Sequence, residues 1–231
     1  MKTVAIHQPN YLPWAGYFYK MLACDDFIFL DDVVMATRSF SNRNRVKTKD
    51  RVLWLTVPCN HVWGETLIKD VTIADQKWRK KHLRTLEESY KKAPYLDEYV
   101  PDLREILLTN DVGLCDLNIR LIKQVCEWLN ISCSFHTSSA LGVSSKADDR
   151  IIDLVKELGG TTYLSGHGGA NYQTEEKFKK EKIDLVYYNF QPPAYPQLWG
   201  EFEAGLSIVD LLFNCGADSR SILDHSGTPQ R

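Results

Sequence analysis

Short apolar runs and amphipathic segments alternate at the start of the chain. Residues 2–6 are rich in β-branched side chains and predict a short strand. Residues 8–13 contain two prolines and an asparagine, which predicts a loop leading into a helix at about 14–24. The continuous apolar run at 27–30 is typical of a strand buried on both faces. Strand, loop, helix and strand in this order form a βαβ unit with parallel strands.

The same order of elements returns late in the chain. Apolar residues recur every three or four positions over 114–129 and 151–158, and each pattern predicts an amphipathic helix. Gly159 and Gly160 close the second helix as a left-handed cap. Further elements are expected as strands at 132–136, 162–165 and 185–190 and as a helix near 174–181. This alternation predicts an α/β fold with a mainly parallel, Rossmann-like sheet and flanking helices.

The middle of the chain departs from this alternation. Residues 37–60 are rich in basic and amide side chains. The elements expected here are a strand at 52–58, a hairpin or edge strand within 63–73 and a basic helix at 76–92, followed by a segment that Pro94 and Pro101 punctuate. We interpret 37–112 as a helical and β insertion within a single α/β domain spanning 1–231. The tail from His225 to Arg231 is expected to be mobile.

Composition narrows the class of partner. The 231 residues include 28 Lys+Arg and 30 Asp+Glu, a formal charge of −2, which argues against binding nucleic acid by bulk charge. No apolar run reaches the roughly 18 residues that a membrane span needs. His7 and the polar residues after it interrupt the apolar start that a signal peptide would continue. We therefore expect a cytoplasmic protein with no nucleic-acid and no membrane partner.

Cysteine and histidine spacing favours neither a disulfide framework nor a metal site. None of the six cysteines forms a C-x-x-C pair, so we expect free and mostly buried thiols. The alternative is a catalytic cysteine, for which Cys215 before Gly216 is the first candidate. The histidines lack the spacing of a zinc site, and no metal is predicted.

Polar residues follow several of the predicted strands. His7 comes just past the first strand, Asp31 and Asp32 just past the second, and Ser165 and Gly166 just past a later one. In open parallel sheets, ligands bind beyond the carboxyl ends of the strands. If these strands are neighbours, the five residues meet at one rim of the sheet.

His7 is the most informative of these residues. An imidazole with a pKa near neutrality can act as a general base toward an attacking amine or hydroxyl. The alternative is a histidine hydrogen-bonded within a turn. Asp31 or Asp32 could orient the imidazole, hold a divalent cation, accept a sugar hydroxyl or cap a strand end. Adjacent strand residues face opposite sides, so the two are not expected to act as a dyad.

Three further features suggest ligand contacts. Arg43 and Arg45 alternate along an extended segment, so both can face the diphosphate of a nucleotide or nucleotide sugar, or else form a solvated basic loop. The glycine-rich loop after Ser165 could bring backbone N–H groups to an anion or form a tight turn. Tyr11 and Tyr172 lie in predicted rim loops and could stack on a sugar or base.

Ser207 and Asp210 have a structural interpretation of their own. A serine followed three residues later by an acid, opening an apolar run that ends at Gly216, is typical of a capping box with a glycine stop.

Five stretches of the chain resemble the WbqC-like proteins. They are I-H-Q-P-N-Y-L-P-W-x-G-Y-F (6–18), F-L-D-D-V (29–33), N-R-N-R-V-K (42–47), Y-L-S-G-x-G-G-x-x-Y (163–172) and L-S-I-V-D-L-L-F-N-C-G (206–216). The resemblance implies work on nucleotide-activated sugars in the synthesis of O-antigen and other surface polysaccharides, particularly the placing of acyl or aminoacyl groups on amino sugars. With His7, Asp31, Asp32 and Ser165 as catalytic candidates, the motifs imply substrate-binding roles for Asn10, Tyr11, Asn42, Arg43, Arg45, Gly166, Tyr172, Gln197 and Asp210.

A second likeness concerns the order of the first elements. A strand, a proline loop, W-x-G-Y entering a helix and an apolar strand look like the start of nucleotidyltransferase-like folds, which carry H-x-G-H where Trp14 to Tyr17 stand. Both histidines are missing here. The expected function is an amide-forming N-acyl or aminoacyl transferase acting on a nucleotide-linked amino sugar. The alternatives are an ATP-dependent ligase and a non-catalytic nucleotide-sugar binding module. The sequence leaves the cofactor, the acyl or aminoacyl donor and the oligomeric state open.

Overall fold

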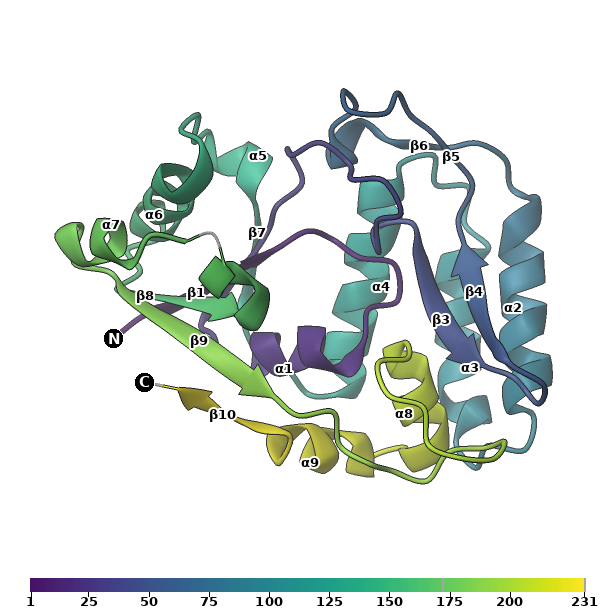
Figure 1. The fold of residues 1–231 in the computed structure, drawn as a ribbon. Helices are drawn as coiled ribbons and strands as arrows, with labels where there is room; N and C mark the ends of the chain where they lie inside the picture. Colours follow the sequence, from purple (N-terminus) through teal and green to yellow (C-terminus); the bar gives the residue numbers. More distant parts are fainter. Residues whose placement is uncertain (172, 231) are drawn as a thin grey trace.

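A large, mainly parallel sheet forms the centre of the protein. The computed structural model describes residues 1–171 and 173–230, and within them the sheet has six strands in the order β10-β9-β8-β1-β2-β7 (Figure 1). The strands are β1 (Thr3–His7), β2 (Asp26–Phe29), β7 (Ser134–Thr137), β8 (Thr162–Gly166), β9 (Asp184–Phe190) and β10 (Gly227–Gln230). All pair in parallel except β10, which is antiparallel to β9. The predicted α/β fold with a mainly parallel, Rossmann-like sheet is confirmed.

Both faces of the sheet are buried, as its apolar strands require. Val4 and Ile6 point into one hydrophobic cluster, and Ala5, between them on β1, points into the other. The first cluster is covered by α5 (Ser138–Leu141), α6 (Ala147–Glu157) and α7 (Glu175–Lys180). The second is covered by α1 (Ala15–Leu22), α4 (Leu114–Trp128), α8 (Ile208–Cys215) and α9 (Asp218–Asp224). Figure 1 shows α6 and α7 above the sheet and α1 and α9 below it.

The strand order reverses between β1 and β8. From β1 the chain moves outward through β2 to β7, then returns to the other side of β1 and continues through β8 to β9. The β1–β8 ladder ends at the pair Ala5 and Leu164, whereas the β8–β9 ladder continues to Gly166 and Tyr188. The carboxyl ends of β1 and β8 therefore separate at the reversal, which is where open α/β sheets bind ligands.

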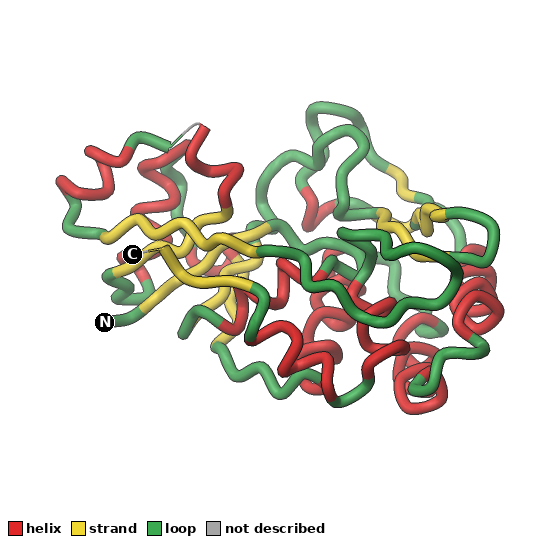
Figure 2. Tube along the Cα trace, turned by 60° about the horizontal axis from the view of Figure 1, so that its bottom comes forward, coloured by secondary structure: helices red, strands yellow, loops and turns green. Residues whose placement is uncertain are grey.

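The insertion between β2 and β7 extends the second hydrophobic cluster. Its elements are β3 (Arg43–Lys47), β4 (Val52–Thr56), β5 (Cys59–Asn60), a 3-10 turn η1 (Ile68–Asp70), β6 (Thr72–Ile73), α2 (Lys77–Tyr90) and α3 (Leu96–Leu107). Figure 2 shows the large sheet at one end of the molecule and the insertion at the other. The hairpin or edge strand expected within 63–73 is the short strand β6, which pairs with β5. Across the described residues, no helix has the length and apolarity to cross a bilayer.

The sequence pattern assigned no element to the segment with Pro94 and Pro101, and the expectation of a mobile tail was wrong. The segment punctuated by Pro94 and Pro101 forms α3, with Pro101 inside the helix. Buried Leu103 and Leu107 anchor this helix in the core, so tertiary packing outweighs the proline. The tail expected to be mobile instead contributes β10, which pairs with β9 at the edge of the sheet.

Candidate functional site

A cavity of about 330 Å³ opens at the carboxyl ends of β1, β8 and β9. We call it the β1–β8 crevice. Its lining residues are Ile6, His7, Trp14, Lys20, Tyr163, Ser165, Gly166, Gly168, Gly169, Tyr188 and Phe190. The structure thus brings His7, Ser165 and Gly166 together at the rim where the strand-end rule placed them. It also adds Lys20, which the sequence analysis did not single out.

His7 lines the crevice as a neutral imidazole. Its Nδ1 lies 3.1 Å from the carbonyl oxygen of Gln8, and because a carbonyl only accepts, we assign the proton to Nδ1. Nε2 then carries a lone pair. Burial and the positive charge of Lys20 lower the pKa of His7 to about 4, against a smaller raising effect of the Gln8 hydrogen bond. Near neutral pH the imidazole therefore carries only the Nδ1 proton, and Nε2 is free to accept another.

Lys20 brings a buried ammonium group to the same crevice. The residue is 2% exposed, and its Nζ donates a hydrogen bond of 2.7 Å to the carbonyl oxygen of Ile6. Nζ also lies 5.9 Å from the centroid of the Tyr163 ring. Burial lowers the pKa of Lys20 to about 8, so most molecules still carry the charge at pH 7. The sequence signal was a single lysine within the otherwise apolar helix α1, whose role only the fold reveals.

The turn after β8 closes one side of the crevice. Ser165 is buried, and its Oγ lies 3.4 Å from the carbonyl oxygen of Gly166. A 3-10 turn, η2 (His167–Asn171), follows. A Cβ at Gly169 would stand 2.3 Å from Ser165 Oγ and 2.6 Å from Gln173 Oε1, so any other residue there would force these side chains to move. Gly169 therefore allows the close approach of the turn to Ser165.

Asp31 and Asp32 lie at the end of the neighbouring strand β2 and are held by the segment after β7. Asp31 accepts hydrogen bonds from Ser138 Oγ at 3.0 Å and from the backbone N–H and Oγ of Ser139 at 2.9 and 2.6 Å. Asp32 pairs with Arg150 at 2.5 Å, and its Oδ1 shares the single proton of the Ser138 hydroxyl with Asp31. Burial would raise the pKa of Asp32, but these partners outweigh it and lower the pKa below its usual range.

This arrangement changes the role expected of the two carboxylates. The group that fixes the His7 ring is the Gln8 carbonyl oxygen rather than Asp31 or Asp32. Neither carboxylate lines the β1–β8 crevice. Their contacts tie the end of β2 to the region between β7 and α6.

Asn42, Arg43 and Arg45 lie on or beside β3, outside the lining of the crevice. Arg43 and Arg45 do face one side together, with guanidinium carbons 4.4 and 6.0 Å from the centroid of the Trp54 ring. Arg45 also contacts Glu203 at 3.4 Å and the carbonyl oxygens of Ala204 and Gly205 at 3.3 and 3.4 Å. Asn42 donates to the Val57 carbonyl oxygen at 3.1 Å. Protein groups therefore already occupy much of this donor set.

Asp210 and Gln197 organise the loop between β9 and α8. Asp210 accepts hydrogen bonds from the hydroxyl groups of Tyr90 at 2.7 Å and Tyr195 at 2.8 Å, and burial raises its pKa. Gln197 accepts from Lys47 Nζ at 3.1 Å. The capping box predicted at Ser207 and Asp210 was wrong. No side-chain cap forms, and Ser207 Oγ instead donates to the Leu12 carbonyl oxygen at 2.8 Å.

The loop after β1 is held from within the core. Asn10 and Tyr11 are both buried, and the Tyr11 hydroxyl lies 3.0 Å from His82 Nδ1. The prediction that Tyr11 stacks on a ligand at the rim was therefore wrong. Asn44 donates to the Leu12 carbonyl oxygen at 2.6 Å, which fixes the next residue of the same loop. Tyr172, the other predicted stacking residue, lies outside the described residues.

Cys215 does not have the character of a nucleophile. The residue is buried, and burial raises its pKa to about 11, so its thiol stays protonated at neutral pH. It is a free cysteine packed in the core, as are Cys24, Cys115 and Cys126.

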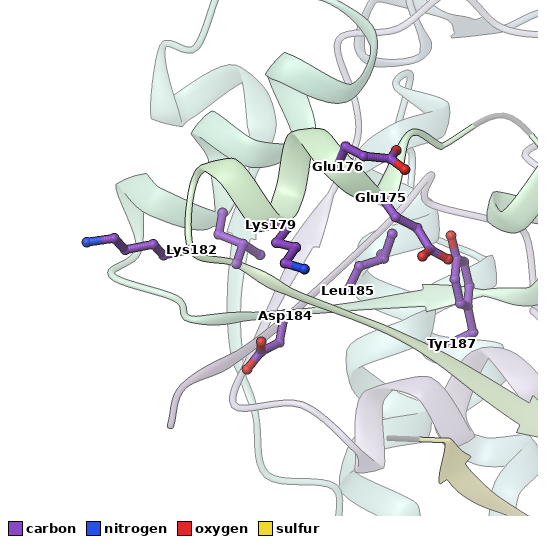
Figure 3. A pocket seen from close by; sticks show the side chains of 8 residues that line it. Glu175, Glu176, Lys179, Lys182, Asp184, Leu185 and Tyr187 are labelled. Atoms are coloured by element: carbon purple, nitrogen blue, oxygen red, sulfur yellow. The ribbon is translucent and has the colours of Figure 1, made fainter.

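A larger hollow of about 750 Å³ lies between α7 and the start of β9 (Figure 3). Charged side chains of both signs line it, among them Glu175, Glu176 and Lys179 from α7 and Asp184 from β9. Asp184 is the first residue of its strand, so this hollow extends to the amino end of β9, away from the strand reversal. Exposed charged side chains make up most of its lining, and we place the candidate site in the β1–β8 crevice at the strand reversal.

A family model and a relative each match nearly the whole chain. The model of a family described as the WbqC-like protein family matches residues 8–222. The chain is 36% identical over 227 residues to the uncharacterized protein Rv1507c of Mycobacterium tuberculosis (strain ATCC 25618 / H37Rv). The aligned region covers 96% of this chain and 98% of that protein. No solved structure matches it.

Proposed function

The chain belongs to the WbqC-like protein family, and we propose that it is an amide-forming transferase. In this proposal, the amine of a nucleotide-linked amino sugar receives an acyl or aminoacyl group. The observation that carries the proposal is His7. Its imidazole is neutral, has a lone pair on Nε2 and lines the crevice at the strand reversal. The substrate class follows from what the family resemblance implies for surface polysaccharide synthesis, and we place the protein in the cytoplasm on that basis.

The proposed reaction assigns the proton transfers to His7. The amine nitrogen attacks the carbonyl carbon of the donor, and a C–N bond forms. His7 Nε2 takes a proton from the nitrogen, which becomes strongly acidic once it has added to the carbonyl. Collapse of the intermediate breaks the bond to the leaving group, which departs with the electron pair and takes the proton back from His7. The low pKa of this imidazole makes it a weak base but a strong acid, which suits the second transfer.

The turn after β8 supplies the other element of the proposed mechanism. Gly166 stands at the end of β8 without a side chain to cover its backbone. Its N–H, or a neighbouring one in the turn, would donate to the oxyanion of the intermediate. Loss of one such donor typically costs about 2.7–4 kcal/mol of transition-state stabilisation. Ser165 next to it keeps the turn close to the strand end.

Mass spectrometry of the reaction mixture tests the function. The purified protein is incubated with UDP- or dTDP-linked amino sugars and with acyl thioesters or aminoacyl donors. We expect a sugar nucleotide heavier by one acyl or aminoacyl group. His7→Ala should lower the rate by about 100-fold or more, whereas His225→Ala, at the exposed position just after α9, should not. Absence of product with every donor, or full activity of His7→Ala, would refute the proposal.

The order of the sheet supports a second candidate. Counted along the chain, the parallel strands lie in the order 3-2-1-4-5, which is the order of nucleotide-binding α/β folds. An ATP-dependent ligase would release pyrophosphate only when an acid substrate is present. Saturable binding of nucleotide sugar without any turnover would instead identify a binding module.

A further inference from the structure

The ammonium group of Lys20 lies where the β1–β8 ladder ends. Ala5 and Leu164 are the last pair of the β1–β8 ladder, and Ile6 is the next residue of β1. The carbonyl oxygen of Ile6 accepts from Lys20 Nζ at 2.7 Å. Lys20 therefore reaches up from α1 and places its ammonium group between the two strand ends, at the base of the crevice.

The charge of Lys20 lacks a protein counterion. The titratable groups around it are His7 from β1, Tyr163 from β8, Tyr188 from β9 and Cys24 just beyond the end of α1, and none of them is a carboxylate. Within the described part of the chain, no carboxylate pairs with this residue. A buried ammonium group without an anion is costly, and one bond to a carbonyl leaves two of its three N–H donors for a ligand.

The walls of the crevice suit a bulky anion. Gly166, Gly168 and Gly169 present backbone without side chains, and a Cβ at Gly168 would meet no atom within 4 Å. The lysine ammonium is a compact point charge, a form well matched to phosphate oxygens. The aromatic side chains of Trp14 and Phe190 border the same space.

We propose that the β1–β8 crevice binds a phosphate group of its ligand on the Lys20 ammonium, beside His7. This inference rests on the proposed function for the identity of the ligand as a nucleotide sugar. The diphosphate is thereby assigned to Lys20 rather than to Arg43 and Arg45, as the sequence had suggested. Arg45 already contacts Glu203, and Arg43 stacks on Trp54. The sugar amine would then lie within reach of His7.

Calorimetry with inorganic phosphate and with pyrophosphate tests the assignment. Lys20→Met keeps the apolar stem and removes the charge, and Lys80→Met makes the same change at an exposed position of α2. We expect Lys20→Met to bind both anions at least about tenfold more weakly, and Lys80→Met to bind them as the parent does. Equal affinity of Lys20→Met and the parent would overturn the proposal.

A measurement on the unaltered protein covers the case in which Lys20→Met does not fold. A phosphate anion beside His7 stabilises the imidazolium, so saturating phosphate should raise the pKa of His7 above its free value of about 4. The C2–H resonance of His7, followed by NMR between pH 3.5 and 8, reports this shift, with that range chosen to bracket the pKa values involved. An unchanged titration of His7 at saturating phosphate would also overturn the proposal.

The two proposals fail independently. Lys20-dependent phosphate binding without acyl transfer refutes the transferase and keeps the anion site. Acyl transfer that Lys20→Met leaves intact refutes the anion site and keeps the transferase. Competition by UDP but not by AMP would assign the phosphate to the nucleotide sugar, and the reverse would assign it to an adenylate.

Discussion

The hydroxyl of Tyr90 in α2 donates a hydrogen bond of 2.7 Å to the carboxylate of Asp210 in α8. The two residues are 120 positions apart, and the bond ties the insertion to the C-terminal helices. A second donor, the hydroxyl of Tyr195, holds the other oxygen of this buried carboxylate. The assignment of Asp210 as a substrate-binding residue therefore competes with a role that the fold itself requires.

We expect Tyr90→Phe to destabilise the protein by about 1–3 kcal/mol, because it leaves a buried carboxylate short of a donor. Urea denaturation of the variant and the parent gives the difference in the free energy of unfolding. Tyr95→Phe, at a half-buried tyrosine near the start of α3, is the matched control and should change it by less than about 0.5 kcal/mol. Equal stability of Tyr90→Phe and the parent would contradict the role we give the bond.

A second prediction concerns the turn after β8. Gly169→Ala would bring a Cβ to 2.3 Å from Ser165 Oγ, whereas Gly168→Ala would meet no atom within 4 Å. We expect the first variant to lose about 1–3 kcal/mol of stability and to weaken phosphate binding, since the crevice wall must shift. The second should keep the stability of the parent. Thermal unfolding measures the stability of both variants, and calorimetry measures their phosphate binding. Equal losses of stability in the two variants would contradict the role we give to the close approach of Gly169 to Ser165.

A third prediction links His7 to the pH dependence of stability. The pKa of His7 is about 4 in the folded protein against 6.5 for the model group, so the unfolded chain binds the proton more tightly. The stability contributed by the neutral imidazole is thus present above pH 6.5 and is lost as the pH falls toward 4, by about 3 kcal/mol at most. In His7→Gln this part of the loss should disappear. Urea denaturation at pH 7 and pH 5 measures it, and an unchanged pH dependence in His7→Gln would exclude the assignment.

The sequence predicts those parts of the fold that local patterns determine. The apolar run of β2, the β-branched run of β1 and the helical spacing of α4 each lie where the pattern indicates. The rule that ligands bind beyond strand ends placed His7 and Ser165 together correctly, because it depends only on strand direction and order.

The features that the sequence could not reveal depend on contacts between distant residues. The hydroxyl of buried Tyr11 lies 3.0 Å from Nδ1 of His82, a partner 71 positions away along the chain. β10 pairs with the edge of β9, and the polar sequence of the tail contains no pattern that predicts this strand. Lys20 looks like an ordinary helix lysine until the fold sets its Nζ against the Ile6 carbonyl oxygen.

The last prediction concerns the pH dependence of anion binding. With a pKa of about 8, Lys20 loses its charge as the pH rises from 7 to 10, and affinity for a phosphate monoester such as UMP should fall through this range. The probe itself does not titrate there, because its second pKa is about 6. His7 is already neutral, burial raises the pKa of Tyr188 to about 12, and a hydrogen bond with Cys133 together with burial raises that of Cys24.

Lys20→Arg separates this charge effect from a general weakening of the protein. A guanidinium stays protonated through the whole range, so a folded Lys20→Arg variant should bind UMP with an affinity that no longer falls between pH 7 and 10. The parent should lose about tenfold for each pH unit above 9, since binding then requires uptake of one proton. Calorimetry in two buffers of different ionisation enthalpy counts that proton directly. A flat profile in the parent, or binding without proton uptake at pH 9.5, would place the phosphate away from Lys20.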